Sequence, residues 1–202
     1  MCRIRELQMK YPDTISPDFS ARDALDGVDP LLVNRWSPRA FVKTDISDSD
    51  LALLFEAARW APSCFNAQPW VFHVSTEKSF DDYLDLLLEG NQTWAREASV
   101  LGFVVVKKTF PHNGKTNIYA EYDAGAAWMA MTVQARQMGL YTHGMGGIKH
   151  EDVAAYLNLD DDHRVVCGFA IGVAAAPDTL PDELAEKEKP SPRKPLSDVL
   201  RR

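Results

Sequence analysis

Cysteine is scarce in this chain, and its scarcity limits the chemistry that the sequence supports. Three cysteines, Cys2, Cys64 and Cys167, are spread over 202 residues without a CxxC pair. An odd number at such distances argues against a disulfide framework or a zinc site and favours a reducing compartment. The histidines show no HExxH or other ligand spacing, so we expect no metal site.

Long apolar runs and an excess of positive charge are also missing. No stretch approaches the roughly 20 residues of a membrane span. The first residues, MCRIRELQMKYPD, lack the apolar region of a secretory signal peptide. Acidic residues outnumber basic ones by 29 to 22, which gives a formal net charge of −7. Because this balance disfavours nucleic acid and anionic membranes as partners, we expect a cytoplasmic protein that binds neither.

The remaining sequence suits one domain that follows an N-terminal extension. Residues 1–28 are polar and mixed, which predicts an extension over the surface with room for a short helix, and residues 29–202 form the domain. Hydrophobic periodicity predicts helices over 45–60, 78–89, 118–138 and 151–157, and strands over 71–74, 100–106 and 164–174. Ser47 is placed to cap the first helix, and Gly139 lies just beyond the end of the longest. Long helices between few strands favour an α+β fold with three layers over a doubly wound sheet.

The longest predicted helix carries information about assembly. Its segment AGAAWMAM, residues 124–131, contains no charge, whereas a surface helix shows a polar face. We expect this helix to be buried on all sides, either against a second subunit or as the central helix of a monomer.

Four short clusters contain the side chains that suit a phosphate and a planar ring. Arg35, Ser37 and Arg39, within RWSPR, offer two guanidinium forks and a hydroxyl. The loop PSCFNAQPW, residues 62–70, carries amides and aromatic rings that suit a heterocycle. GMGGI, residues 144–148, lets a backbone approach a ligand closely but lacks the GxGxxG spacing. Arg193 and Lys194 add two late cations. The alternative for each cluster is an ordinary turn, loop or solvated tail.

Taken in this order, the clusters resemble the nitroreductase superfamily. The resemblance rests on RWSPRAF, EAARWAPSCFNAQPWVF, YDAGAAWMAMTVQARQMGL, GMGGI and the late RKPLSDV, and it extends from about residue 29 onward. It implies an α+β, three-layer α/β/α fold with a mixed central sheet. It also implies an intertwined homodimer with FMN at the subunit interface.

The resemblance also assigns residues to the cofactor. The positions that match its FMN-binding motifs are Arg35, Trp36, Ser37, Arg39, Pro62, Ser63, Cys64, Asn66, Gln68, Met145, Gly146, Gly147, Arg193 and Lys194. Arg39 is expected near the phosphate or the reduced flavin, and a backbone N–H of Gly146 or Gly147 near flavin N5. No side chain is expected to act as an acid or base.

The implied activity is a ping-pong transfer of hydride from NADH or NADPH, through the flavin, to a nitroaromatic, quinone or similar small acceptor. Alternatives within the same fold are a dehalogenase, an enone reductase or a flavin-degrading enzyme. A flavin-binding protein without turnover is another alternative. A hydrolase that uses Cys64 or Ser63 lacks a nucleophile-elbow motif.

Overall fold

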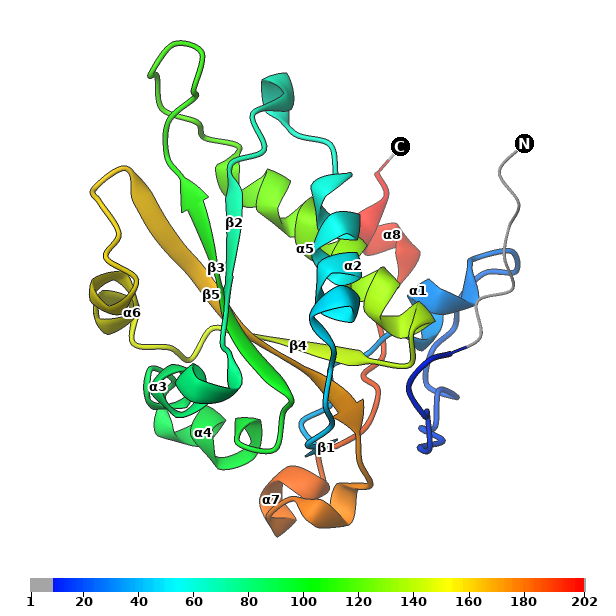
Figure 1. Ribbon diagram of the computed structural model, residues 1–202. Coiled ribbons are helices and arrows are strands. Elements are labelled where there is room, and N and C mark those ends of the chain that lie inside the picture. Colours follow the sequence, from blue (N-terminus) through cyan, green and yellow to red (C-terminus); the bar gives the residue numbers. More distant parts are fainter. Residues whose placement is uncertain (1–8, 202) are drawn as a thin grey trace.

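A five-stranded sheet forms the middle layer of the computed structural model, which describes residues 9–201 (Figure 1). Its strands are β1 (Phe41–Val42), β2 (Trp70–Val74), β3 (Val100–Lys107), β4 (Tyr141–Met145) and β5 (His163–Ala174). The order is β1-β5-β3-β2, and β4 also pairs with β5. The expected α+β fold is therefore confirmed.

The strand pairs correct one detail of the expectation. Each of the four pairs, β1 with β5, β2 with β3, β3 with β5 and β4 with β5, is antiparallel. Strands β3 and β4 run parallel to each other, but each pairs with β5, which is antiparallel to both. Within the described residues the sheet is thus antiparallel and not mixed.

Two helical layers cover the two faces of this sheet (Figure 1). Helices α2 (Asp48–Arg59) and α5 (Ala120–Gln137) pack on one face, against alternate β3 residues such as Val104 and Val106. Helices α3 (Phe80–Asp85), α4 (Glu89–Ala95) and α6 (His150–Tyr156) pack on the other, against Leu101, Phe103 and Val105. This alternation follows from the two-residue period of a strand. Shorter helices α1 (Pro30–Asn34), α7 (Asp182–Ala185) and α8 (Leu196–Val199) lie outside these layers.

The helix expected over 78–89 is only partly formed, because α3 ends at Asp85 and α4 begins only at Glu89. After α3, residues 86–88 leave the helical path: Leu87 forms an antiparallel bridge with Ile148. The Leu88 amide donates to the Gly147 carbonyl at 3.0 Å, and the Lys149 amide donates to that of Leu86 at 2.9 Å. These long-range bonds compete with the helix and hold the glycine segment after β4 in place.

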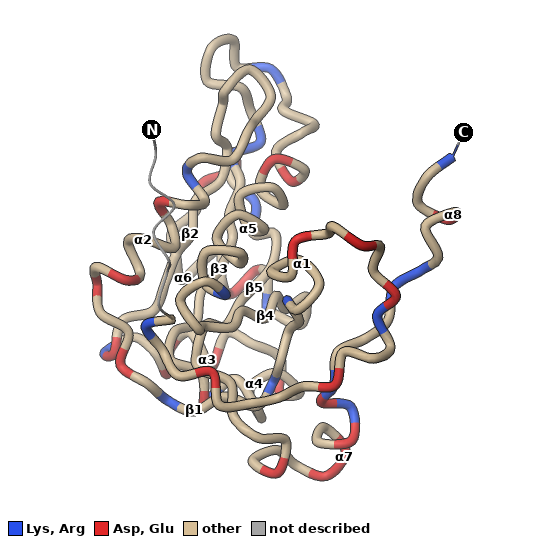
Figure 2. The backbone as a smooth tube through the Cα atoms, turned by 90° about the vertical axis from the view of Figure 1, so that its right-hand side faces the viewer, with Lys and Arg blue, Asp and Glu red and all other residues tan. Residues whose placement is uncertain are grey.

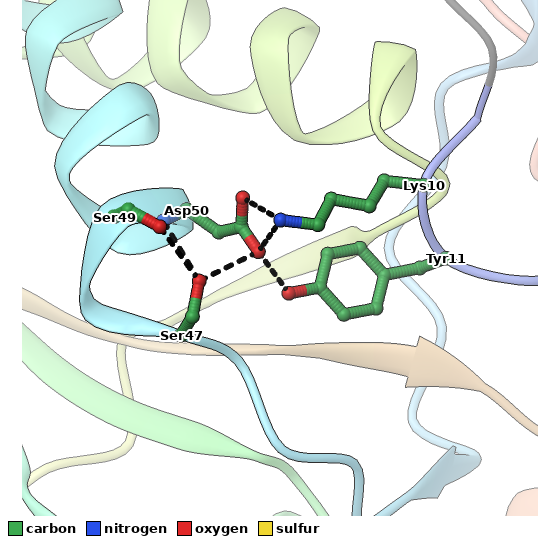
Figure 3. Close-up of polar contacts among 5 residues, drawn as sticks. All are labelled: Lys10, Tyr11, Ser47, Ser49 and Asp50. Carbon is green, nitrogen blue, oxygen red and sulfur yellow. Dashed lines mark hydrogen bonds and ion pairs between the residues drawn. The ribbon is translucent and has the colours of Figure 1, made fainter.

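The described part of the N-terminal extension, residues 9–28, contains no helix, but it is firmly attached (Figure 3). Asp50, which is 2% exposed at the start of α2, accepts hydrogen bonds from Lys10 at 2.7 Å and from the Tyr11 hydroxyl at 2.6 Å. Ser47 caps the same helix, as expected. The hydrogen bond from Lys10 lowers the pKa of Asp50, so the carboxylate stays ionised at neutral pH. Cys2 and the rest of residues 1–8 lie outside the described residues.

Glycine is required where the extension crosses α5. Gly139 follows the last turn of α5 with φ of +89°, as the sequence predicts for a residue that ends a helix. A Cβ atom there would lie 2.1 Å from the Tyr11 carbonyl oxygen. The Tyr11 amide also donates to the Met138 carbonyl at 2.9 Å. The extension therefore packs directly on the backbone at the end of α5.

Candidate functional site

Basic side chains from three separate segments meet in a cavity of about 360 Å³. The lining residues are Arg22, Arg35, Trp36, Ser37, Arg39, His143, Lys187, Lys189, Ser191 and Arg193. Six of them are lysine or arginine, although the whole chain carries a net charge of −7. Figure 2 shows the basic residues of the tail as blue stretches on the chain between α7 and α8. Such a local concentration of cations is what a phosphate requires.

The structure brings together five of the residues that the sequence assigned to the cofactor: Arg35, Trp36, Ser37, Arg39 and Arg193. Arg35 donates to the Ser37 hydroxyl at 3.4 Å. Trp36 is 6% exposed and meets Tyr141 edge to face, so most of its ring belongs to the core. Lys194 instead lines a neighbouring apolar cavity of about 420 Å³ that also touches Arg22 and Arg193.

A buried carboxylate fixes the backbone beside Arg39. Glu188 accepts hydrogen bonds from the amides of Arg39 and Ala40, at 2.6 and 2.8 Å, through one oxygen. Its other oxygen lies 3.9 Å from the Arg39 guanidinium. Glu188 is buried and is not among the residues that line the cavity, so the charged side chains of its lining are all basic.

Met145, Gly146 and Gly147 lie at the end of β4, a strand that the sequence analysis missed, on the same chain segment as His143. A Cβ atom at Gly146 would meet nothing within 4 Å, so this backbone faces open space. Gly147 is held from behind, because the Asn91 side chain donates to its carbonyl at 2.9 Å. These glycines thus form a rigid edge that a planar ligand can approach.

The loop that contains Pro62, Ser63, Cys64, Asn66 and Gln68 does not line the basic cavity. It lies at the top of Figure 1, whereas β1, which follows Arg39, lies at the bottom. The Cys64 amide donates to the buried Asp123 carboxylate of α5 at 3.0 Å, and Gln68 donates to Asn66 at 3.0 Å.

This loop is also strained and turned outward. The backbone φ angles of Phe65, Asn66 and Gln68 are +52°, +53° and +45°. Residues other than glycine adopt this left-handed region at a cost in conformational energy. Phe65 is 77% exposed. Pro62, Asn66 and Gln68 are exposed as well, although one side of the Phe65 ring contacts Phe110 and His112.

His143 is the one histidine that lines the cavity, and it is held as a neutral ring. Burial is the main cause that lowers the pKa of His143 to about 4; the positive charge of Arg39 acts in the same direction, and hydrogen bonds to the backbone of Pro38 and Ser37 act against both. Its Nδ1 lies 2.8 Å from that carbonyl oxygen. The ring also contacts Trp94 at 4.6 Å between centroids.

This depressed pKa predicts a specific pH dependence of folding. In the unfolded chain His143 takes up a proton near pH 6.5, but in the folded chain only near pH 4. Stability is therefore lost as pH falls between these values, by about 2 to 3 kcal/mol at pH 4.5. We expect urea unfolding at pH 7.5 and 4.5 to show a smaller loss for His143→Asn than for the unchanged protein. An equal loss in both proteins would contradict a neutral, buried His143.

Within residues 9–201, no three His, Cys, Asp or Glu side chains lie close enough to hold a metal ion. The same residues include no helix with the length and apolar character to cross a membrane. Sequence reasoning missed Arg22, Lys187, Lys189 and Ser191 as lining residues. Lys187 and Lys189 alternate with Glu186 and Glu188 in the sequence, so neither stood out as part of a basic cluster.

Comparison with known proteins identifies the family of this chain. The model of the nitroreductase family matches residues 32–173. The chain belongs to the nitroreductase family and is an oxidoreductase of the nitroreductase type.

Individual relatives agree with this assignment. The chain is 25% identical over 195 residues to a 4-nitrobenzoate reductase from Pseudomonas putida, across 74% of this chain and 86% of the relative. A crystal structure of an oxidoreductase containing FMN is 42% identical and superposes with a TM-score of 0.85, over 89% of this chain and 93% of the other. A nitroreductase-like protein from Desulfovibrio desulfuricans, solved in complex with FMN, is 25% identical with a TM-score of 0.67, over 85% and 95% of the two chains.

Proposed function

We propose that this chain is an FMN-dependent oxidoreductase that transfers hydride from NADH or NADPH to a nitroaromatic, quinone or similar small organic acceptor. The observation that carries the proposal is the basic cavity of an otherwise acidic protein, built from the RWSPR segment and the tail. Relatives described as containing FMN support the choice of cofactor. We place the protein in the cytoplasm, in keeping with the free thiols of Cys64 and Cys167.

The donors in the cavity fit a phosphate monoester. Arg35, Arg39 and Arg193 offer guanidinium groups and Ser37 a hydroxyl. No described ion pair joins Arg35 or Arg193 to a carboxylate, and the Arg39 pair with Glu188 is long at 3.9 Å. The Nη2 atom of Arg22 is buried and has no hydrogen-bond partner among the described residues. A set of cations that lacks internal partners is suited to an external dianion.

The glycines after β4 are the proposed contact for the ring system. When bound, FMN supplies hydride transfer between the nicotinamide and the acceptor. The open backbone of Gly146 lets the ring lie close, and an N–H of this segment stabilises negative charge on it. Residues 88–91 brace the segment through the hydrogen bonds to the Gly147 carbonyl, so these amides are already oriented in the free protein. No side chain is required to move a proton.

We further propose a homodimer in which the loop over residues 62–68 completes the site of the partner subunit. Within one chain, α5 buries only the face that carries Ala124, Ala127 and Met131. Tyr122, on its other side, is 80% exposed. Trp60, just before the loop, is 75% exposed, and Ile118, just before α5, is 77% exposed. Exposed aromatic and aliphatic side chains next to a strained loop are typical of a subunit interface.

The test begins with the visible spectrum of the purified full-length protein, with FMN added if the protein is colourless. We expect a flavin spectrum that bleaches when NADH or NADPH is titrated under nitrogen. Initial rates with varied nicotinamide and varied nitroaromatic or quinone should give parallel lines, because one site serves both substrates in turn. Intersecting lines would exclude the ping-pong cycle, and a protein that fails to bind FMN would overturn the proposal. Bound flavin without turnover would indicate a non-catalytic flavin-binding protein.

A further inference from the structure

Arg22 of the N-terminal extension reaches into the basic cavity and joins three segments of the chain. Its Nη1 donates to the carbonyl oxygens of Val33 and of Arg35, the latter at 2.8 Å. Its Nε donates to the Ser191 carbonyl at 3.1 Å. Two of its three nitrogens are thus used to hold RWSPR and the tail together. The third, Nη2, is buried without a partner in the described residues.

The surroundings of Arg22 are positive. Burial lowers its pKa, and the charges of Arg193 and then Arg35 lower it further. The pKa of Arg35 is lowered in the same way, by burial and then by Arg193. None of the ion pairs between described residues gives any of these three arginines an acidic partner. Three guanidinium groups that repel one another, with no carboxylate between them, are a site that an anion stabilises.

We propose that Arg22 is a ligand of the cofactor phosphate, so that the N-terminal extension forms part of the cofactor site. This rests on the proposed function, in which FMN places its phosphate in the basic cavity. Nη2 supplies a charge-assisted hydrogen bond to the phosphate, while Nη1 and Nε keep the guanidinium in position.

The contacts of residues 10–13 with the domain explain how the extension brings Arg22 to the basic cavity. Lys10 and Tyr11 are bound to Asp50 (Figure 3). Two residues after Tyr11, Asp13 accepts hydrogen bonds from Arg136 at 2.7 Å and from the Tyr141 hydroxyl at 2.9 Å. These contacts fix the chain on the body of the domain before it reaches Arg22. The extension is thereby ordered independently of the phosphate.

The decisive experiment compares FMN with riboflavin, which has the same ring system but no phosphate. Dissociation constants are measured by flavin fluorescence with flavin-free full-length protein. For Arg22→Ala we expect FMN to bind about 10- to 100-fold more weakly, as for the loss of one charge-assisted hydrogen bond. Riboflavin affinity should stay the same. Arg96→Ala is the matched control, because it removes one positive charge from the end of α4, outside the cavity, and should change neither affinity.

A second variant and a second probe guard against a folding defect. Arg22→Lys keeps the charge but not the guanidinium fork, and we expect an FMN affinity between those of the unchanged protein and Arg22→Ala. Inorganic phosphate should raise the thermal unfolding midpoint of the flavin-free protein more than that of either Arg22 variant.

Each remaining outcome has a distinct meaning. An equal loss for FMN and riboflavin would show that Arg22 only braces the chain, and would overturn the inference. An unchanged FMN affinity in Arg22→Ala, alongside a loss in Arg35→Ala, would also overturn it while leaving the proposed function intact. Unchanged FMN affinity in both variants would mean that the phosphate binds outside this cavity, which would overturn the inference and remove the observation that carries the proposed function, although FMN still binds.

Discussion

Replacing Arg35 and Arg39 together with alanine is expected to yield a folded protein that is purified without FMN. Each guanidinium offers the phosphate a charge-assisted hydrogen bond of about 1.5 to 3 kcal/mol. Loss of both should weaken FMN binding on the order of 1,000-fold. Neither residue is fully buried, so the free protein loses little packing. The measurement is a fluorescence titration of flavin-free protein with FMN.

The control for this double variant is Arg59→Ala with Arg96→Ala. This control also removes two positive charges, but from the ends of α2 and α4, outside the cavity. Arg59 forms an ion pair there with Glu56 at 2.6 Å. We expect it to bind FMN nearly as well as the unchanged protein, because salt screens the effect of exposed charges that lie outside the cavity. If both double variants lost FMN equally, net charge alone would govern binding. If neither did, the phosphate would lie elsewhere.

The local patterns of the sequence predict most helices and strands of this fold. Ser47 begins α2 and Gly139 follows the end of α5. Each acts on backbone groups only a few residues away, so these two helix ends can be predicted from the local sequence. The strand expected over 164–174 is confirmed as β5, and its apolar run reflects burial on both faces. Likewise, RWSPR was recognisable as a phosphate-binding candidate, since its donors are neighbours in sequence.

The parts that the sequence does not predict depend on contacts between distant residues. Strand β4 is short and contains His143 and Gly144, so it shows no alternation of apolar residues. The break after α3 follows from hydrogen bonds to residues 147–149, and nothing in its leucine-rich sequence indicates a stop. In the sequence Asp50 looks like an ordinary carboxylate in the first turn of a helix, yet it also anchors Lys10, 40 positions earlier. Arg22 likewise enters the cavity through contacts with distant residues, since its guanidinium donates to the Ser191 carbonyl.

The division of the proposed flavin site between two chains predicts that two inactive variants restore each other. One chain carries Arg35→Ala and Arg39→Ala, and the other carries Asn66→Ala and Gln68→Ala in the outward loop. The loop variant loses two amide contacts to the ring, so each homodimer should show little activity. In a mixed dimer, one of the two sites receives an intact cavity and an intact loop, whereas the other carries both defects.

Unfolding and refolding an equal mixture of the two variants should therefore restore about a quarter of the activity of the unchanged protein, since random pairing makes about half of the dimers mixed and each has one intact site. The control is each variant refolded alone, which should stay inactive with excess FMN. Restoration would establish that the loop acts across the subunit interface, and it would explain why residues 62–68 are ordered far from the cavity of their own chain. Activity that never exceeds the two homodimers would place both parts of the site in one subunit, and the exposed face of α5 would then need a different partner.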